Sequence, residues 1–334
     1  MQRRSRWRIG ESIPPPSRAI LQRLGVWDHF LAQDHLPSAG SCASWGAPVL
    51  GYNDFILDMQ GKGWHLDRAD FDAMLSAAVV RHGITVARDL RLCEVKRNDD
   101  GYLLSFQDNS GERVHITTGF MVDATGVIAG AVRRLGVARN QTDCLAVIFS
   151  VFALKRPNAV PSQALLEACE YGWWYAAKLP KKRIMIALAV DPSGHHRFSD
   201  AGTWLHGLHT TCHVAEWLQR GGVAIASSPT LETALAPSVI LSRVVGEHWL
   251  AVGDAASAYD PIAAQGIVKA LRDGDSAADA ISGFLTGAGE SPLLVYQDNV
   301  FARFRDYLRV RRHLYTLERR WLHSPFWQRR LHCQ

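Results

Sequence analysis

The sequence predicts an α/β protein in which two strand–helix portions flank a strand-rich block. Residues 115–123 and 249–254 are apolar runs of strand length, and each ends in an aspartate at a turn that leads toward a helix. Between them, residues 144–190 show the short alternating runs that are typical of a sheet. The chain has 334 residues, 47% of them hydrophobic, which suits one large domain or two closely packed ones.

The composition argues against several classes of protein. The 37 Lys and Arg residues exceed the 32 Asp and Glu residues by only five, too few to predict a nucleic-acid partner, although a small positive charge suits an anionic cofactor. The six cysteines include no Cys-x-x-Cys pair, and the basic N-terminus has no apolar stretch behind it. We therefore expect a cytoplasmic location. The longest apolar run, residues 144–154, is too short to span a membrane.

The elements of the first half follow from caps, turns and periodicity. The clearest helix covers residues 67–82, since Asp67 can cap its start and Gly83 follows its end. The run from Asn98 to Gly101 predicts the turn of a hairpin. The other expected elements are a short helix at 17–24, strands at 84–89, 90–97 and 102–107, and a short helix at 132–135.

The second half alternates strands with longer helices. Pro180 and the two lysines after it predict a turn between two strands. Those strands are expected at 172–177 and 183–190, and helices at 203–220, from Pro261 to about 285, and at 296–330.

The strongest local signal for a ligand site is the segment 249–267. A buried strand places Asp254 at its C-terminal edge, where open α/β sheets bind ligands. Pro261 suits the first turn of a helix, whose free N–H groups around residues 264–267 would form a positive end for a negatively charged group. An ordinary strand–loop–helix with a capping aspartate accounts for the same spacing equally well.

This segment resembles the second FAD fingerprint of FAD-dependent monooxygenases and flavin-dependent halogenases of the p-hydroxybenzoate hydroxylase fold, roughly G-D-A-A-x(4–5)-P-x-x-G-Q-G. The resemblance implies that Asp254 binds the ribityl chain of FAD and that Pro261 lies against the isoalloxazine ring. It also implies that the helix end at Gln265, Gly266 and Ile267 faces the pyrimidine carbonyl. One departure is Ala264, which stands where the first Gly of G-Q-G is usual and whose Cβ would narrow the approach to the ring.

Three further segments resemble the same family. The run W-H-L-D-R-A-D-F-D at 64–72 is similar to a helix start whose arginine, here Arg68, lies near the cofactor. The run V-D-A-T-G at 122–126 is similar to the strand end beside the dinucleotide, which implies a role for Asp123. The run R-I-G-E-S is similar to a turn that would supply Arg8 for the pyrophosphate and Glu11 for the cofactor pocket. Taken alone, a capping aspartate or a solvated arginine is the commoner explanation for the first two.

The resemblance implies a fold and its domain boundaries. An FAD/NAD(P)-binding Rossmann-like domain would be assembled from residues 1–143 and 235–290, with a β-rich substrate domain at 144–234 and a C-terminal helical segment at 291–334. No G-x-G-x-x-G occurs in the sequence, so the first βαβ unit of that domain is expected to be missing. A misassigned start, a truncated chain or a degraded gene would each explain this, and a truncated inactive remnant or a binding module stays an alternative to an enzyme.

The resemblance leaves two reactions open. Flavin-dependent halogenases carry a W-x-W-x-I-P strand and a P-L-E-S-T-G-I loop, whereas here the strand at 172–180 is only similar and Ala263 stands in place of the loop glutamate. Loss of that carboxylate removes proton-handling capacity and weighs against halogenation. The resemblance therefore favours a monooxygenase that hydroxylates an aromatic substrate through a flavin hydroperoxide, with a flavin-dependent halogenase as the alternative. NAD(P)H or a separate flavin reductase would supply the electrons.

The sequence says less about the substrate than about the fold or the cofactor. Some halogenase-like relatives that modify tryptophan side chains of partner proteins share a G-W-W-Y strand and a terminal E-x-R-W and F-W-x-R-R segment, here at 318–321 and 326–330. The resemblance therefore implies a small aromatic or a protein-borne tryptophan, although a docked amphipathic helix explains the terminal segment as well. Four aromatic side chains either wall a substrate pocket or pack in the core: Trp45, Trp173, Trp174 and Tyr175.

The sequence offers no catalytic base and no metal site. In flavin monooxygenation the cofactor performs the oxygen chemistry, so no catalytic residue is predicted. His206, His209 and His213 share one helix face beside Cys212. No carboxylate or further cysteine completes a ligand set at suitable spacing, so we expect these histidines to face solvent.

Overall fold

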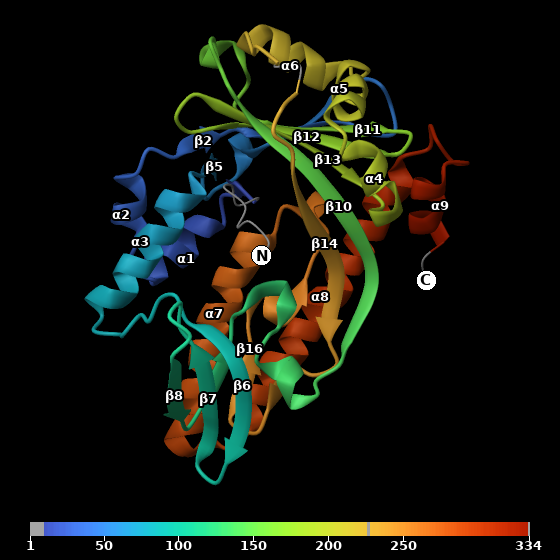
Figure 1. Cartoon of the computed structure of the whole chain (residues 1–334). Helices are drawn as coiled ribbons and strands as arrows, with labels where there is room; N and C mark the ends of the chain where they lie inside the picture. The colour runs from blue at the N-terminus through green and yellow to red at the C-terminus, as the bar shows by residue number, and fades with distance from the viewer. Residues whose placement is uncertain (1–9, 226–227, 333–334) are drawn as a thin grey trace. The chain divides into compact units, whose positions relative to one another are not determined.

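The computed structural model describes residues 10–225 and 228–332 (Figure 1). The chain divides into two compact units: unit 1 comprises Met1–Leu75, Cys144–Ala236 and Val310–Gln334, and unit 2 comprises Ser76–Asp143 and Pro237–Arg309. The units change after residues 75, 143, 236 and 309, and the domains expected to meet near 143 and 235 stay a prediction. The first 75 residues, however, group with the strand-rich block, and the C-terminal helical segment is divided at residue 310.

Unit 1 is built on a sheet in which β13, β12, β11, β3 and β4 follow β10. The strands are β10 (Arg139–Ala153), β13 (Arg183–Val190), β12 (Gly172–Leu179), β11 (Ala164–Cys169), β3 (Gly40–Ser44) and β4 (Gly51–Asp54). The first four pair antiparallel, and β3 joins β11 in parallel, with Cys42 opposite Leu165. Because this pairing adds residues 40–54 to the sheet, the N-terminal part of the chain belongs to this unit.

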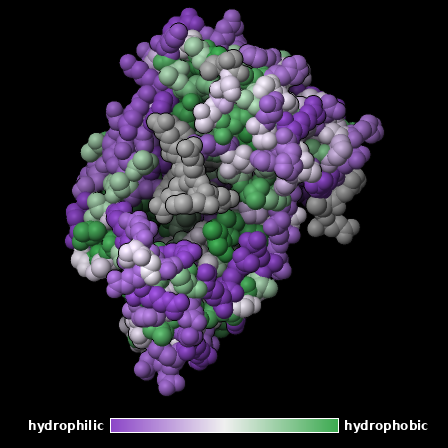
Figure 2. Space-filling view, viewed as in Figure 1, coloured by the Kyte–Doolittle hydropathy of each residue, from purple (hydrophilic) through white to green (hydrophobic). Residues whose placement is uncertain are grey.

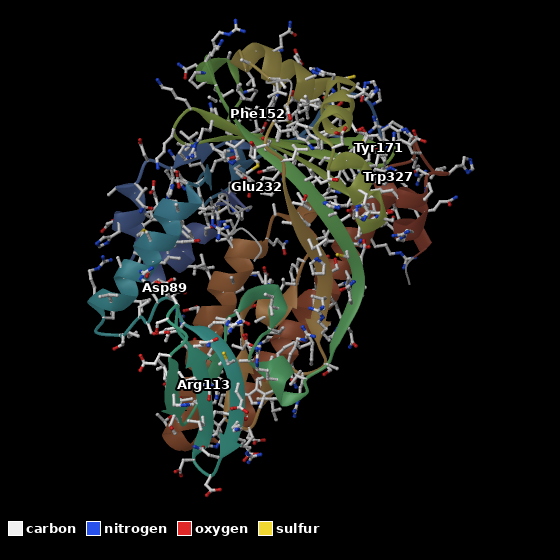
Figure 3. All side chains as sticks on the ribbon, viewed as in Figure 1. Asp89, Arg113, Phe152, Tyr171, Glu232 and Trp327 are labelled. Carbon is white, nitrogen blue, oxygen red and sulfur yellow. The ribbon has the colours of Figure 1, made fainter. Side chains whose placement is uncertain are left out.

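Three helices pack on one face of this sheet. They are α4 (His195–Phe198), α5 (Ala201–His209) and α6 (His213–Gly221). Alternate residues of β12 and β13, such as Trp174 and Leu188, form a buried apolar cluster with Trp204 of α5. Phe152, labelled in Figure 3, stacks on Trp204 with ring centroids 6.3 Å apart. Burial of each such side chain contributes roughly 1.5–3 kcal/mol.

A second, smaller sheet of unit 1 holds the N-terminal segment. Its strands run in the order β1 (Ser12–Ile13), β5 (Gly63–His65) and β2 (Leu36–Ser38). The helices of this part are α1 (Ser17–Arg23), α2 (Trp27–Leu31) and the residues of α3 (Arg68–Arg81) up to Leu75. Phe30 of α2 packs edge-on against Trp64 and Phe71, with centroids 5.3 and 6.1 Å apart. These aromatic contacts hold α2 and α3 together next to the strands.

Unit 2 contains a parallel strand pair and a hairpin sheet. The pair is β9 (Met121–Asp123) with β16 (Trp249–Ala251), extended by β15 (Val245–Gly246). The hairpin sheet is β6 (Arg91–Asn98), β7 (Gly101–Gln107) and β8 (Arg113–Thr118), and Figure 2 shows a mostly hydrophilic surface over it. The other elements are β17 (Ser257–Ala258) and α7 (Gly266–Gly283), together with the part of β14 (Glu232–Leu241) from Pro237 and the part of α8 (Ser291–Leu317) up to Arg309. Tyr296 of α8 donates to the Ala251 carbonyl at 2.8 Å, so this helix is fixed to the strand pair.

Several expected elements are confirmed. Residues 68–81 of the expected helix at 67–82 form α3, and the Asp67 carboxylate accepts hydrogen bonds from the N–H groups of Ala69 and Asp70 at 3.1 and 3.4 Å. The hairpin turn lies where it was expected, with Asn98 opposite Gly101. The strands at 172–177 and 183–190 are β12 and β13, and Lys181 and Lys182 form their left-handed turn.

Three expected elements are wrong. Residues 84–89 form no strand and are exposed. The helix expected at 203–220 is two helices, because the Glu167 carboxylate of β11 accepts hydrogen bonds from three N–H groups at the start of α6, those of Cys212, His213 and Val214, at 2.6–2.9 Å. The helix expected at 296–330 ends at Leu317, and a separate helix, α9 (Pro325–His332), follows.

Candidate functional site

The parallel pair of unit 2 brings two acidic turns to one sheet edge. Asp123 lies opposite Ala251 in the register of β9 and β16, and the N–H of Val252 donates to the Asp123 carbonyl at 3.0 Å. The turn after β16 begins with Gly253, whose φ of +57° suits glycine. Asp254 follows with its side chain 47% exposed. The carboxyl ends of parallel strands are where open α/β sheets bind ligands.

Asp254 is connected to the helix that follows the loop. The Nζ of Lys269, on the first turn of α7, lies 3.4 Å from Oδ1 of Asp254. Among the described residues this ammonium is the polar partner of the carboxylate. One carboxylate oxygen therefore stays available to accept a hydrogen bond from a ligand hydroxyl.

The loop between Asp254 and α7 differs from the expected helix start. Pro261 does not open the helix but begins a separate 3-10 turn, Pro261–Ala263. The Asp260 carboxylate caps this turn by accepting a hydrogen bond from the N–H of Ile262 at 3.0 Å. Ala264 then adopts a left-handed conformation with φ +47°, and α7 starts at Gly266. A left-handed residue cannot continue a right-handed helix, so the chain restarts there.

The N-terminal end of α7 is open. Gln265 at its N-cap makes no side-chain capping bond, and a Cβ built on Gly266 would meet nothing within 4 Å. Among the described residues, the first backbone hydrogen bond of α7 runs from the N–H of Lys269 to the Gln265 carbonyl, at 2.8 Å. The exposed N–H groups at Gly266 and Ile267 form a positive end for a ligand oxygen. The predicted residues Asp254, Gln265, Gly266 and Ile267 thus come from one connected piece of unit 2, and the donors and acceptors it presents suit the polyol and carbonyl groups of FAD.

Asp123 occupies a different kind of position. It is 1% exposed, and both of its oxygens accept bonds from the protein. Oδ1 accepts from the N–H and hydroxyl of Thr125 at 2.9 and 2.6 Å, and Oδ2 accepts from the N–H groups of Ala131 and Val132 at 2.9 Å. This arrangement favours a role in anchoring the turn after β9, the alternative that the spacing left open, over direct contact with a cofactor.

The predicted residues of unit 1 are brought together by the pairing of β1 with β5. This pairing places Ser12 opposite His65, so the segment from Gly10 to Ile13 lies beside the start of α3. Arg68 donates from Nη1 to the Gly10 carbonyl at 2.9 Å and pairs with Asp72 at 3.4 Å. Arg8 lies outside the described residues.

Glu11 is a buried acid in this segment. It is 3% exposed, and burial raises its pKa from 4.5 to about 7, with Arg68 opposing the shift. Within the described part of the chain its Oε1 has no hydrogen-bond partner. Buried acceptors are rarely left unpaired, so this oxygen is suited to a donor from a ligand.

The four predicted pocket aromatics separate onto two faces of the sheet. Trp174 lies in the apolar cluster under α5, with its ring 5.1 Å from that of Trp204, which favours core packing. Trp173 donates from Nε1 to the hydroxyl of Tyr315 at 3.2 Å. Trp45 donates to the Leu314 carbonyl at 2.7 Å and packs edge-on against Trp327 of α9, labelled in Figure 3. Both Trp45 and Trp173 therefore contact the aromatic C-terminal segment of unit 1.

Tyr175 belongs to a hydrogen-bonded chain that sequence reasoning missed. Its hydroxyl lies 3.1 Å from the Ser12 hydroxyl, which lies 2.9 Å from Nδ1 of His65, and Nε2 of His65 lies 2.9 Å from the Ser162 carbonyl. Burial lowers the pKa of His65 to about 4, so the ring is neutral. Because a carbonyl can only accept, Nε2 carries the proton and Nδ1 accepts from Ser12, which leaves Tyr175 to donate to Ser12.

The missed residues Lys269, Ser12 and His65 carried weak signals. Ser12 and His65 lie inside family-like runs, but neither run predicted that they would face each other. A lysine at the fourth position of a helix is usually solvated. Only its 5% exposure distinguishes Lys269.

The sequence predicted neither a metal site nor a membrane-spanning helix. His206 and His209 are exposed, His213 hydrogen-bonds through Nε2 to the Pro48 carbonyl at 2.8 Å, and no group of three metal-binding side chains exists in the part of the chain that the structure describes. No helix among residues 10–225 and 228–332 is long and apolar enough to cross a membrane.

Comparison with known proteins identifies relatives over nearly the whole chain, although no protein-family model matches. A putative FAD-dependent oxidoreductase, LodB of Marinomonas mediterranea, is 27% identical over 333 residues, which cover 98% of this chain and 87% of LodB. The crystal structure of CmlS, a flavin-dependent halogenase, has a TM-score of 0.85 at 24% identity and is matched over 97% of this chain and 61% of its own. The peptidyl tryptophan dihydroxylase QhpG, described as essential for tryptophylquinone cofactor biogenesis, has a TM-score of 0.77 at 22% identity, over 98% of this chain and 71% of its own. The expected α/β fold class is confirmed by these structures.

Proposed function

We propose that this chain, which is similar to FAD-dependent oxidoreductases and flavin-dependent halogenases, binds FAD at the segment from Asp254 to Ile267 and hydroxylates an aromatic substrate. The observation that carries the proposal is the half-exposed Asp254 carboxylate, held by Lys269 next to the open N-terminal end of α7. Both groups are presented to solvent by a segment whose sequence resembles a flavin-binding fingerprint.

Each residue of this segment has a role that its chemistry supports. Asp254 would accept a hydrogen bond from a ribityl hydroxyl. The N–H groups at Gln265, Gly266 and Ile267 would stabilise negative charge on the pyrimidine carbonyl, since the helix end is positive. Pro261 offers an apolar surface to the ring. When bound, FAD supplies the oxidising chemistry, and the protein positions the substrate and excludes water.

The resemblance proposes further cofactor contacts in unit 1. Among the described residues the buried Oε1 of Glu11 has no hydrogen-bond partner, and the charge of the Arg68 guanidinium, 21% exposed, lowers the pKa of Glu11 against the effect of burial. A protonated Glu11 can donate a hydrogen bond and an ionised one can accept it, so the group can adapt to either kind of ligand atom. We propose these contacts from the residues of unit 1 alone.

Hydroxylation is favoured over halogenation by one position in the loop. Ala263 ends the 3-10 turn that begins with Pro261, and its methyl group replaces the carboxylate of the halogenase loop. An alanine can neither move a proton nor stabilise a positive charge there. Halogenation is the second candidate, and it is favoured by the known proteins, because CmlS and several other relatives are named as flavin-dependent halogenases.

The electron donor and the substrate are proposed from the relatives. NAD(P)H or a separate flavin reductase would reduce the flavin. The substrate would be a small aromatic compound or a tryptophan side chain carried by a protein, and the likeness to QhpG supports the latter.

The test begins with the visible spectrum of the purified chain after incubation with FAD and removal of the unbound cofactor. We expect retained flavin absorbance, reduced in D254N and unchanged in D298N, a matched change of an exposed aspartate on α8. A colourless wild-type protein would refute the proposal and favour the remnant.

The reaction is then distinguished by product analysis. The reduced holoprotein is supplied with isotopically labelled dioxygen, bromide and an indole or a tryptophan-containing peptide. Incorporation of labelled oxygen into the aromatic product is expected. A brominated product without labelled oxygen would replace hydroxylation by halogenation.

A further inference from the structure

Lys269 is a buried cation directly beneath the proposed flavin segment. The residue is 5% exposed, and its Nζ lies 2.6 Å from the Ser257 carbonyl, 3.4 Å from Oδ1 of Asp254 and 3.7 Å from Oδ2 of Asp273. It also lies 5.1 Å from the centroid of the Tyr259 ring. The ammonium thus touches the loop at three points between β16 and the 3-10 turn.

The charges around Lys269 balance. Arg303 of α8 pairs with Oδ1 of Asp273 at 2.8 Å, and the N–H of Gly253 donates to Oδ2 of Asp273 at 3.2 Å. Two cations, Lys269 and Arg303, therefore face two carboxylates, Asp273 and Asp254. Because Asp273 forms its shorter ion pair with Arg303, Asp273 compensates the charge of Lys269 only in part, and the ammonium also attracts the Asp254 carboxylate. A buried ammonium without such partners would carry a large desolvation penalty.

Asp254 depends on this ammonium for its orientation. Its side chain is 47% exposed, and an exposed aspartate without a fixed partner samples several rotamers, whose ordering costs binding free energy. With Oδ1 attracted to Lys269, the second oxygen is directed away from the buried cation and toward solvent. Lys269 itself, whose side chain is 4% exposed, is shielded from a ligand in solvent.

We propose that Lys269 is a positioning residue that orients the Asp254 carboxylate for a hydroxyl-bearing ligand, here the ribityl chain of FAD. This inference rests on the proposed function. It adds that a buried residue on the first turn of α7 contributes to the affinity of the site for FAD. The helix therefore contributes both its open N-terminal end and a buried counter-charge to the same site.

A double-mutant cycle on FAD binding tests the inference. The dissociation constant of FAD is measured for the wild type, D254N, K269Q and the double variant, because glutamine keeps a donor for the Ser257 carbonyl but carries no charge. D254N is expected to weaken binding about tenfold, as for the loss of a charge-assisted hydrogen bond. K269Q is expected to lose no more than D254N, and the double variant no more than D254N alone.

Two further variants separate charge from structure. K269R, which keeps the charge, is expected to retain more affinity than K269Q. K96M, a change of an exposed lysine paired with Glu94 in β6, is the matched control and is expected to leave binding unchanged. If K269Q does not fold, K269M replaces it in the cycle, and a K269R variant that binds as weakly as D254N would still contradict the inference.

The outcomes distinguish the inference from its premise. A wild type that does not bind FAD overturns the proposed function and this inference with it. If the wild type binds FAD, but the double variant loses affinity by the product of the losses in D254N and K269Q, only the inference is overturned. A larger loss in K269Q than in D254N would show that Lys269 holds the loop as a whole rather than Asp254, and would overturn it as well.

Discussion

Two networks, one in each unit, compensate their polar groups in opposite ways. In unit 2, the buried residues Lys269 and Asp273 and the partly exposed Arg303 form an ion-pair network in which each cation lies within 4 Å of a carboxylate. In unit 1 the chain from Tyr175 to His65 is neutral throughout, because burial lowers the pKa of His65 to about 4 and raises that of Tyr175. Charge compensation suits a site that presents the Asp254 carboxylate to a ligand, whereas neutral donors and acceptors suit a site whose protons must stay in place.

Glu11 of unit 1 belongs to neither network, and its burial has a different consequence. Burial raises the pKa of Glu11 to about 7, although backbone hydrogen bonds and the charge of Arg68 oppose the shift. A carboxyl with this pKa changes charge near neutral pH. The four predictions below test this contrast, from the largest expected effect to the smallest.

Removing a carboxylate from the unit 2 network has the largest expected effect. D273A removes the carboxylate that pairs with the buried Lys269 and with Arg303, and breaking such a network is expected to lower the free energy of unfolding by about 3–5 kcal/mol. Urea denaturation measures the loss. D306A, which removes the exposed partner of Arg309, is the control and should change stability by less than ~0.5 kcal/mol. An equally small loss in D273A would show that the network is not compensated charge.

Neutralising Glu11 should alter the pH dependence of stability. The folded-state pKa of about 7 lies above the ordinary value of 4.5, so the stabilising contribution of proton binding is full below pH 4.5 and is lost as the pH rises through 7. E11Q, which stays neutral, should therefore match the wild type at low pH and exceed it by up to about 3 kcal/mol above pH 8. The exposed Glu112 provides the control E112Q, which should show no such gain. A constant difference at all pH values would contradict the shift.

The direction of the neutral chain in unit 1 predicts unequal losses. S12A would strand both the Tyr175 hydroxyl and the acceptor Nδ1 of His65, at a cost of about 1–3 kcal/mol. Y175F removes only the terminal donor and leaves the bond from Ser12 to His65 intact, so about 1 kcal/mol is expected. Thermal or urea unfolding compares the two, with the exposed-site variant Y52F as control. A larger loss in Y175F than in S12A would show that the chain runs the other way.

The smallest effect concerns the loop of unit 2. Ala264 has φ +47°, a conformation that costs an L-residue about 1 kcal/mol relative to glycine. A264G should therefore raise the free energy of unfolding by up to about 1 kcal/mol, while A263G, in the preceding 3-10 turn, should lower it slightly. Tighter FAD binding by A264G would in addition show that the Ala264 Cβ narrows the approach to the ring. A destabilised A264G would contradict the assigned backbone strain.

Local signals predicted the elements whose causes are local. Asp67 and Gly83 bracket α3 because a cap and a left-handed glycine act on the nearest turn. Asn98 and Gly101 close the hairpin for the same reason. The buried strand before Asp254 and the positive helix end after it were also visible, since both follow from hydrophobicity and turn chemistry within one segment.

Other features depended on partners far away in the chain. The break between α5 and α6 comes from Glu167, more than 40 residues earlier, whose carboxylate caps α6. Asp123 looked like a ligand-binding acid, but the folded turn directs four protein donors to it. Trp173 and Trp174 were equivalent as neighbours in sequence, and only the pleat of β12 separates the one that contacts Tyr315 from the one under α5.

By itself, the sequence determined the fold class, the flavin-like segment and the residues that it presents, because these depend on short-range periodicity and on side-chain chemistry. The tertiary structure alone decided which acids are saturated and which are available, and it placed Lys269 behind Asp254. The physical reason is that burial and charge compensation are set by contacts between segments distant in the sequence, and these exist only once the chain has folded.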